Sequence, residues 1–168
     1  MPEEWLIDGY NFLHSLNSRK AKPSSKISRE SCLSRIAAFT ASQHCQVTVV
    51  LDGVGQDDEF TGLRLPVPAR PAGGRQAGAR GFCVVYSGPV SADAHIEKYL
   101  FENKGKASFV VVTEDRAIAD MARGSGACVM DAQSFMERLE AAEKDSGDIL
   151  FKHKVKAHGF HRPFEDKI

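Results

Sequence analysis

The sequence predicts an α/β protein with a mainly parallel central sheet, and three observations support this prediction. Short apolar stretches rich in valine alternate along the chain with amphipathic segments of helical length. The apolar stretches are continuous, which is typical of parallel strands buried on both faces. Turn residues such as glycine follow several of these stretches. The expected architecture is therefore one sheet with helices on both faces.

The first two elements lie near the N-terminus. A strand is expected at residues 5–7 (WLI), followed by Asp8 and a turn at Gly9. A helix is expected from Ser28 to about His44, because apolar side chains recur there at the spacing of one helical face. The hydroxyl of Ser28 can cap the N-terminus of this helix.

The second strand is expected in QVTVVLDG, residues 46–53, which is rich in β-branched side chains. Residues 54–81 combine glycines, prolines and arginines with little periodicity, so we expect a long loop. The remaining elements are a strand at residues 82–88, a helix at 91–103, a strand, sharp turn and glycine-terminated helix within 107–126, a short strand at 127–131 and a last helix at 132–144. Thr113 is a candidate cap of the helix within 107–126.

Length and composition limit the class of protein. The 168 residues are most simply one domain, here residues 1–145, followed by a basic C-terminal tail at residues 146–168. Lysine and arginine equal aspartate and glutamate at 22 each, so net charge alone indicates no partner. The chain has no leader pattern, no apolar run near the roughly 18 residues of a membrane span, and no cysteine pair at zinc-ligand spacing. We therefore expect a cytoplasmic protein without membrane contact.

Acidic residues gather where the predicted strands end. Asp8 follows the first strand, Asp52 the second and Asp115 the fourth, while Asp93 begins the helix after the third. The carboxyl ends of parallel strands share one edge of the sheet, where α/β proteins bind ligands. Crowded carboxylates repel one another unless a hard divalent cation such as Mg²⁺ or Mn²⁺ lies among them. Such an ion suits the hydrolysis of a phosphodiester bond.

Each of these acids also has a purely structural interpretation. Asp8 could accept backbone N–H groups in the turn, and Asp52 belongs to a common turn dipeptide. Asp93 and Asp115 could stabilise the first turn of a helix, where a negative charge gains about 0.3–1 kcal/mol. Asn11 could cap a helix. The presence of all four acids at one predicted edge favours the metal-site interpretation.

The order of four sequence elements carries a family resemblance. LIDGYNFLH, VVLDG, SADAHIEK and VVTEDRAIADMARGSGA follow one another along the chain. In this order they resemble the NYN domain of the PIN-like nuclease superfamily, and most of all its YacP-like bacterial branch, over about residues 5–135. The resemblance implies a Rossmann-like, three-layer α/β/α fold. It also implies a metal-dependent endoribonuclease, in some members acting on ribosome-associated messenger RNA.

The resemblance also assigns roles to residues at matching positions. It implies that Asp8, Asp93 and Asp115 form the acidic metal site. Asn11 matches an asparagine that positions a water or a phosphate oxygen, so these four residues are the candidate catalytic set. Asp52 matches a further acid near the site and is an additional candidate ligand.

The chain departs from the family pattern at two positions. Ala94 stands where related sequences often carry a second acid, and Glu114 stands where serine is common. The missing acid leaves the number of bound metal ions open. Glu97, one helical turn from Asp93, is a candidate replacement ligand.

Two basic segments are candidates for binding RNA. Guanidinium groups bind phosphates with a planar fork, and such contacts hold a nucleic acid without reading its sequence. The candidates are Arg64, Arg70, Arg75 and Arg80 in the loop of residues 53–81, and Lys152, Lys154 and Lys156 in the tail. A solvated loop without a ligand is the alternative interpretation.

The sequence also bears on three other classes of function. A phosphotransfer enzyme would normally carry a second acid at the position of Tyr10, and no G-x-G-x-x-G pattern of a dehydrogenase follows a strand. Tyr10 and Phe12 could stack on bases, although core packing is the default expectation for both. The main alternative is a catalytically weak RNA- or ribosome-binding module that keeps the fold, which would be free to lose the acids.

Overall fold

The computed structural model describes residues 4–19, 23–53, 81–105 and 108–157, and within residues 148–157 it describes the helix without its side chains. The chain forms one five-stranded sheet in the order β3-β2-β1-β4-β5, and all four strand pairs are parallel. The strands are β1 (Glu4–Asp8), β2 (Gln46–Leu51), β3 (Phe82–Tyr86), β4 (Phe109–Val112) and β5 (Cys128–Met130). The helices are α1 (Gly9–Ser18), α2 (Arg29–Gln43), α3 (Ala92–Glu102), α4 (Arg116–Ser125) and α5 (Ala132–Ala157), with a short 3₁₀ helix at Pro23–Ser25.

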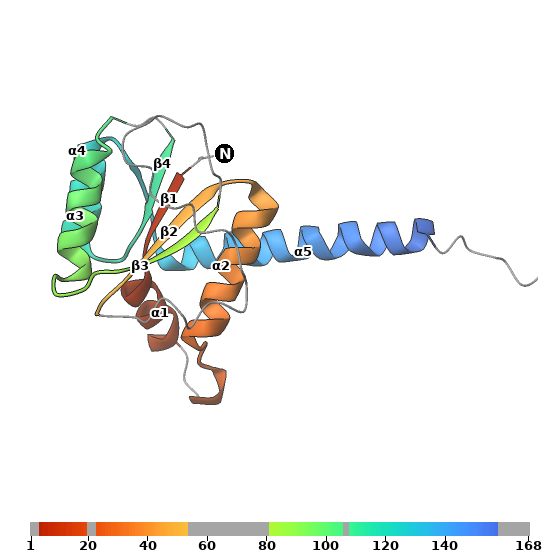
Figure 1. Cartoon of the computed structure of the whole chain (residues 1–168). Helices are drawn as coiled ribbons and strands as arrows, with labels where there is room; N and C mark the ends of the chain where they lie inside the picture. The colour runs from red at the N-terminus through yellow and green to blue at the C-terminus, as the bar shows by residue number, and fades with distance from the viewer. Residues whose placement is uncertain (1–3, 20–22, 54–80, 106–107, 158–168) are drawn as a thin grey trace, which may run out of the picture.

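The predicted α/β fold is confirmed, with helices on both faces of the sheet (Figure 1). Side chains of successive strand residues point to opposite faces. Trp5 and Ile7 accordingly pack in one apolar cluster with α1, α2 and α5. Leu6 packs in a second cluster with α3 and α4. Burial on both faces explains why the strands read as continuous apolar runs.

Aromatic packing fixes α1 and α5 on their side of the sheet. The ring of Phe135 in α5 lies 5.4 Å from the rings of Trp5 and Phe12 and 5.6 Å from that of Phe39. These separations suit edge-to-face and tilted contacts between aromatic rings. Phe12 is therefore a core residue, as expected by default, and it anchors the helix that follows Asp8.

The helix boundaries confirm some predictions and correct others. The Ser28 hydroxyl accepts the N–H of Ser31 at 3.1 Å and caps α2, as predicted. Gly126 ends α4 with a φ of 92°, as the glycine stop signal predicted. The prediction that Thr113 caps α4 is wrong, because Asp115 is the cap. The chain also enters a helix directly at Gly9, where we expected only a turn.

The last helix is longer than predicted. We expected it to end near Lys144, but α5 continues to Ala157 and extends well beyond the sheet (Figure 1). No proline interrupts this stretch, and Gly147 alone costs only about 1 kcal/mol relative to alanine in a helix. The segment of Lys152, Lys154 and Lys156 therefore lies within this helix, and the division into a domain and a basic C-terminal tail stays a prediction.

Several predictions lie outside the described residues. They concern the long loop at residues 54–80 with its four arginines and the end of the chain at residues 158–168. In the part of the chain that the structure does describe, no helix is long and apolar enough to cross a membrane.

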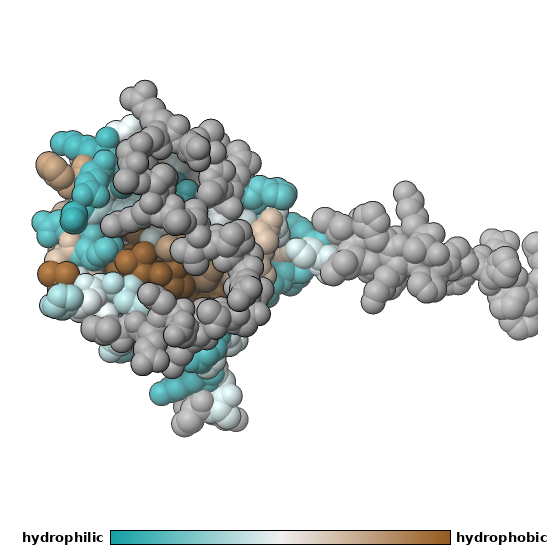
Figure 2. All heavy atoms as spheres, viewed as in Figure 1, coloured by the Kyte–Doolittle hydropathy of each residue, from teal (hydrophilic) through white to brown (hydrophobic). Residues whose placement is uncertain are grey.

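The edge strand β3 is half-buried along its length, and Figure 2 shows an apolar area on the face where this strand passes.

Candidate active site at the carboxyl edge of the sheet

The strand register brings the predicted acids to one edge. Asp8 is level with Val50 of β2, and Ile7 is level with Val112 of β4. Asp52 therefore follows its strand by one residue, and Asp115 lies three residues past the paired Val112. Because these strands are parallel, their carboxyl ends lie on the same side of the molecule. The parallel pairing of β1 with β2 and β4 thus brings the ends of these strands together at one edge, as predicted.

Three of the acids hold the N-termini of helices. The Oδ1 atom of Asp8 accepts the backbone N–H of Asn11 at 3.2 Å, so Asp8 caps α1. Oδ1 of Asp115 accepts the N–H of Ile118 at 3.0 Å and caps α4. Oδ1 of Asp52 accepts the N–H of Ala92 at 2.7 Å, where α3 begins. The positive ends of three helix dipoles therefore face these carboxylates and reduce their mutual repulsion.

These caps reconcile the structural and functional interpretations. Each of the three hydrogen bonds uses Oδ1, and none of them uses Oδ2. A carboxylate held through one oxygen has a fixed orientation and can still present the other oxygen to a ligand. Capping therefore orients the acids without consuming their capacity to bind.

The remaining candidate ligands lie on α3. Asp93 is exposed in the first turn of α3, whose cap is Ser91. Glu97 is exposed one turn further along the same helix. Asp93 thus lies where the sequence predicted it, and its exposure leaves both carboxylate oxygens accessible to solvent and ligands.

Asp8 carries the strongest electrostatic signal of the site. Its side chain is only 4% exposed, and burial raises the pKa of its carboxyl from 3.8 to about 6. The N–H of Asn11 lowers this pKa, while the negative charges of Asp93, Asp52 and Asp115 raise it further. The three other predicted acids are therefore close enough for their charges to act on Asp8.

We expect this shift to make the stability of the metal-free protein depend on pH. The folded state holds a proton on Asp8 up to about pH 6, whereas the unfolded chain releases it near 3.8. The free energy of unfolding should therefore fall as the pH rises from about 4 to about 6, by up to about 3 kcal/mol from this group. Urea unfolding in chelator across this range tests the prediction. A contribution of Asp8 that rises with pH would contradict it.

Asn11 does not cap a helix; it lies in the first turn of α1 and joins two parts of the site. Its side-chain Oδ1 accepts the backbone N–H of Glu114 at 2.8 Å. This contact connects the start of α1 with the loop between β4 and α4, across 103 positions of sequence. It leaves the amide Nδ2 as the donor that Asn11 can offer a water or phosphate oxygen.

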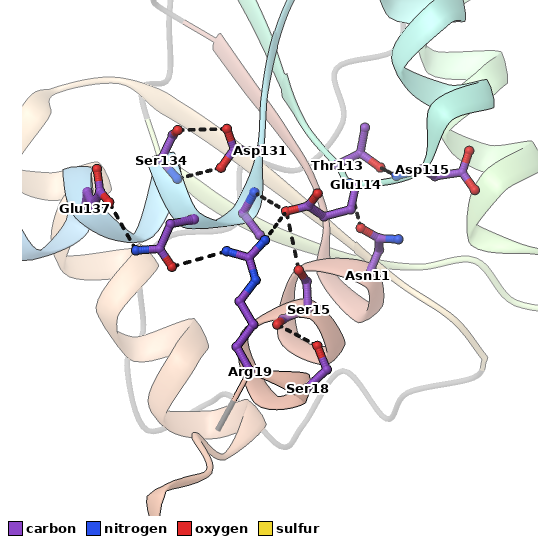
Figure 3. Close-up of polar contacts among 12 residues, drawn as sticks. Asn11, Ser15, Ser18, Arg19, Thr113, Glu114, Asp115, Asp131, Ser134 and Glu137 are labelled. Carbon is purple, nitrogen blue, oxygen red and sulfur yellow. Dashed lines mark hydrogen bonds and ion pairs between the residues drawn. The ribbon is translucent and has the colours of Figure 1, made fainter. Parts of the chain in front are cut away.

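Glu114 is a site residue whose role the sequence did not reveal. Its Oε1 atom accepts the hydroxyl of Ser15 at 3.3 Å and the N–H of Ala132 at 3.1 Å, and it lies 3.7 Å from Nη2 of Arg19. Figure 3 shows Glu114 between α1 and the start of α5, beside Asn11 and Asp115. Its side chain thereby fixes the loop that presents Asp115. No local pattern predicts these contacts, because the partners in α1 are distant in sequence.

A cavity of about 490 Å³ adjoins this loop on the side of α4 and β5. Thr113 and Glu114 of the loop line it, together with Arg116 and Arg123 of α4 and the acids Asp120 and Asp131. Arg123 is paired with Asp120 at 3.0 Å, so the lining carries no excess of positive charge. Thr113 is buried, and its hydroxyl accepts the N–H of Asp115 at 3.1 Å. The cavity thus adjoins the loop that presents Asp115, whereas Asp93 is exposed on α3 and does not line it.

The chemistry of the acids fits a hard divalent cation, because carboxylate oxygens are its preferred ligands. Burial is the main cause of the raised pKa of Asp8, and the charges of Asp93, Asp52 and Asp115 add to it. Among the residues that the structure describes, no three acidic, histidine or cysteine side chains lie close enough to hold one ion together. Mg²⁺ commonly takes one or two carboxylates and keeps several waters. Metal binding by these acids therefore stays a prediction.

Comparisons with known proteins agree on the fold. The model of the YacP-like NYN domain family matches residues 5–64 and 69–167. The crystal structure of Rae1 (YacP) from Bacillus subtilis is similar with a TM-score of 0.63 and 21% identity, covering 91% of this chain and 82% of that chain. A point mutant of the same protein gives a TM-score of 0.64 and 18% identity, covering 91% and 84%. No curated protein sequence matches the chain.

Proposed function

The chain belongs to the family of YacP-like NYN domains, and we propose that it is an endoribonuclease that depends on Mg²⁺ or Mn²⁺. Family membership indicates a nuclease-type function related to RNA. The dependence on metal, messenger RNA as the substrate and the ribosome as a partner are parts of the proposal. The observation that supports it most strongly is the buried Asp8 carboxylate, whose pKa three neighbouring acids help to raise.

We assign the following roles within this proposal. Asp8, Asp93 and Asp115 would hold the cation, one or two of them directly and the others through its bound waters, with Asp52 and Glu97 as further candidates. A bound cation polarises the phosphate and lowers the pKa of an attacking water. Asp8 and Asp115 are held at their orientation by the helices they cap, so little reorganisation is needed when substrate binds.

Asn11 has a separate role in the proposal. Its Oδ1 is engaged by the N–H of Glu114, which fixes the plane of the amide. The Nδ2 group can then donate a hydrogen bond to a phosphate oxygen or to the attacking water. Glu114 is a positioning residue in two ways. Its backbone N–H orients the Asn11 amide, and its side chain holds the loop before α4 against α1 and α5.

The proposed RNA contacts of the two basic segments remain predictions. Arg64, Arg70, Arg75 and Arg80 lie outside the described residues, and the side chains of Lys152, Lys154 and Lys156 are not described. In the described part of the chain, Asp52 lies at the edge that carries the acids, and the segment with these arginines follows it in the sequence.

We expect the purified 168-residue chain to cut single-stranded RNA internally with Mg²⁺ or Mn²⁺ and to lose this activity in excess chelator. Asp93→Asn and Asp115→Asn should each abolish cleavage, because both remove a proposed ligand. Asp145→Asn, which changes an exposed acid on α5, is the matched control and should remain active. The measurement is the pattern of end-labelled fragments, with and without translating ribosomes.

Three outcomes decide between the candidate functions. Full activity of Asp93→Asn or Asp115→Asn, or activity in chelator, would contradict the metal site. RNA or ribosome binding without any cleavage by the unmodified chain would favour the alternative, a catalytically weak binding module. Cleavage that appears only on ribosome-bound messenger RNA would identify the ribosome as a partner.

A further inference from the structure

We propose that Tyr10 and His14 form a stacking platform for one unpaired base of the RNA strand, next to the acidic edge. This inference rests on the proposed function, since it assumes that RNA binds at that edge. Its starting point is the exposure of Tyr10, whose side chain is 62% exposed. The default expectation of core packing is therefore wrong for Tyr10, although it holds for Phe12.

The aromatic pair lies on the solvent side of α1. Tyr10 and His14 are four residues apart, which places them on one face of the helix. Their ring centroids are 6.1 Å apart and their planes differ by 19°, so the rings are stacked. Phe12 and Leu16 lie on the opposite side of α1 and are buried in the core. Packing against the protein thus accounts for Phe12 but leaves the exposure of Tyr10 unexplained.

The position of Tyr10 relative to the acids is set by the chain. Tyr10 follows Asp8 by two residues, so their Cα atoms are at most about 7 Å apart. A base on the Tyr10 ring would therefore belong to a nucleotide close to the phosphate at Asp8. The platform is also held in place, because Asp8 caps α1 and the Ser15 hydroxyl of the same helix donates to Glu114.

Stacking suits this place better than ionic attraction does. The helix sequence GYNFLHSLNS contains no lysine, arginine, aspartate or glutamate, so α1 offers phosphates no permanent positive charge. The acids beside it repel phosphates when no cation is bound. Any base presents a π-face to an aromatic ring, so stacking attracts the strand independently of its charge and tolerates every base. Bases in a duplex are already stacked, so such a platform selects unpaired RNA.

The test measures equilibrium binding in chelator, where the proposed cleavage does not interfere. The probe is a short unstructured RNA that carries 2-aminopurine, whose fluorescence falls when the base stacks. Tyr10→Ala should weaken binding roughly 5- to 30-fold and abolish the change in fluorescence. Tyr10→Phe keeps the ring and should retain both. Phe101→Ala is the matched control, because Phe101 is an 81% exposed aromatic residue near the C-terminal end of α3.

The outcomes separate this inference from the proposed function. If the unmodified chain binds RNA and Tyr10→Ala binds it equally well, the platform is wrong and the proposed function stands. An equal loss in Tyr10→Phe would replace stacking by a hydrogen bond of the hydroxyl, and an equal loss for duplex RNA would also overturn the inference. If the unmodified chain does not bind RNA in chelator, the platform is also wrong, whereas the proposed function is judged separately by cleavage with Mg²⁺ or Mn²⁺. Thermal unfolding of each variant confirms that it is folded.

Discussion

Asp8→Asn is expected to abolish RNA cleavage while making the metal-free protein more stable at neutral pH. The asparagine side chain keeps an oxygen that can cap α1, but it removes a charge whose burial and neighbours raise the pKa to about 6. Loss of that charge should raise the free energy of unfolding by up to about 3 kcal/mol above pH 6. Loss of a preorganised charge at the reacting phosphate should lower the cleavage rate by at least about 100-fold.

Two measurements check this combination of effects. Urea unfolding in chelator should show Asp8→Asn above the unmodified protein at pH 7, and the difference should shrink towards pH 4, where Asp8 is protonated in the unmodified protein. Added Mg²⁺ should stabilise the unmodified protein more than the variant. Asp145→Asn serves again as the control, because this acid is exposed. A variant that is less stable at pH 7, or that still cleaves RNA, would contradict the proposed role of Asp8.

Gly9→Ala is expected to destabilise the protein and to lower its activity. A Cβ atom on Gly9 would lie 2.6 Å from Cδ2 of Leu51, 2.7 Å from Cγ1 of Val49 and 3.0 Å from the carbonyl oxygen of Val50. The leucine methyl could move, but the valine is stiff and the carbonyl belongs to the sheet. The start of α1 would therefore have to shift away from β2, at a cost typical of overpacking, about 1–3 kcal/mol.

The same shift should reach the candidate site. Gly9 lies between Asp8 and Asn11, so moving α1 disturbs both the cap and the bond from Glu114 to the Asn11 amide. Gly124→Ala is the matched control, because a Cβ there meets no atom within 4 Å and the residue lies within α4. That substitution should stabilise the protein by up to about 1 kcal/mol through helix propensity. Equal unfolding free energies for both variants would show that the close approach of Gly9 to β2 does not affect stability.

The parts of the fold that could be predicted are those with a local signal. Five apolar runs became five strands, because parallel strands buried on both faces leave continuous apolar sequence. Ser28 and Gly126 marked the ends of α2 and α4, because capping and left-handed conformations depend on single residues. The edge position of Asp8, Asp52 and Asp115 also followed, because parallel pairing places all carboxyl strand ends on one side.

The local sequence did not predict contacts between residues that are far apart along the chain. Glu114 is an ordinary charged residue in its local sequence, and its contacts with α1 and α5 exist only after the sheet has assembled. Tyr10 and Phe12 are both aromatic residues of one helix, and only the position of the sheet decides that Phe12 is buried and Tyr10 exposed. Such differences depend on tertiary packing, which overrides local propensity.

Gly9 shows most clearly how a local sequence pattern differs from the packing around a residue. The sequence places a glycine between the first strand and Asn11, and this pattern predicts a turn. The assembled fold shows why the residue is a glycine: Gly9 is the first residue of α1, and it lies so close to β2 that a Cβ atom would not fit. The reason is that a local pattern reports the conformations that a residue can adopt. The space around that residue is set by Val49, Val50 and Leu51, about forty positions later in the chain.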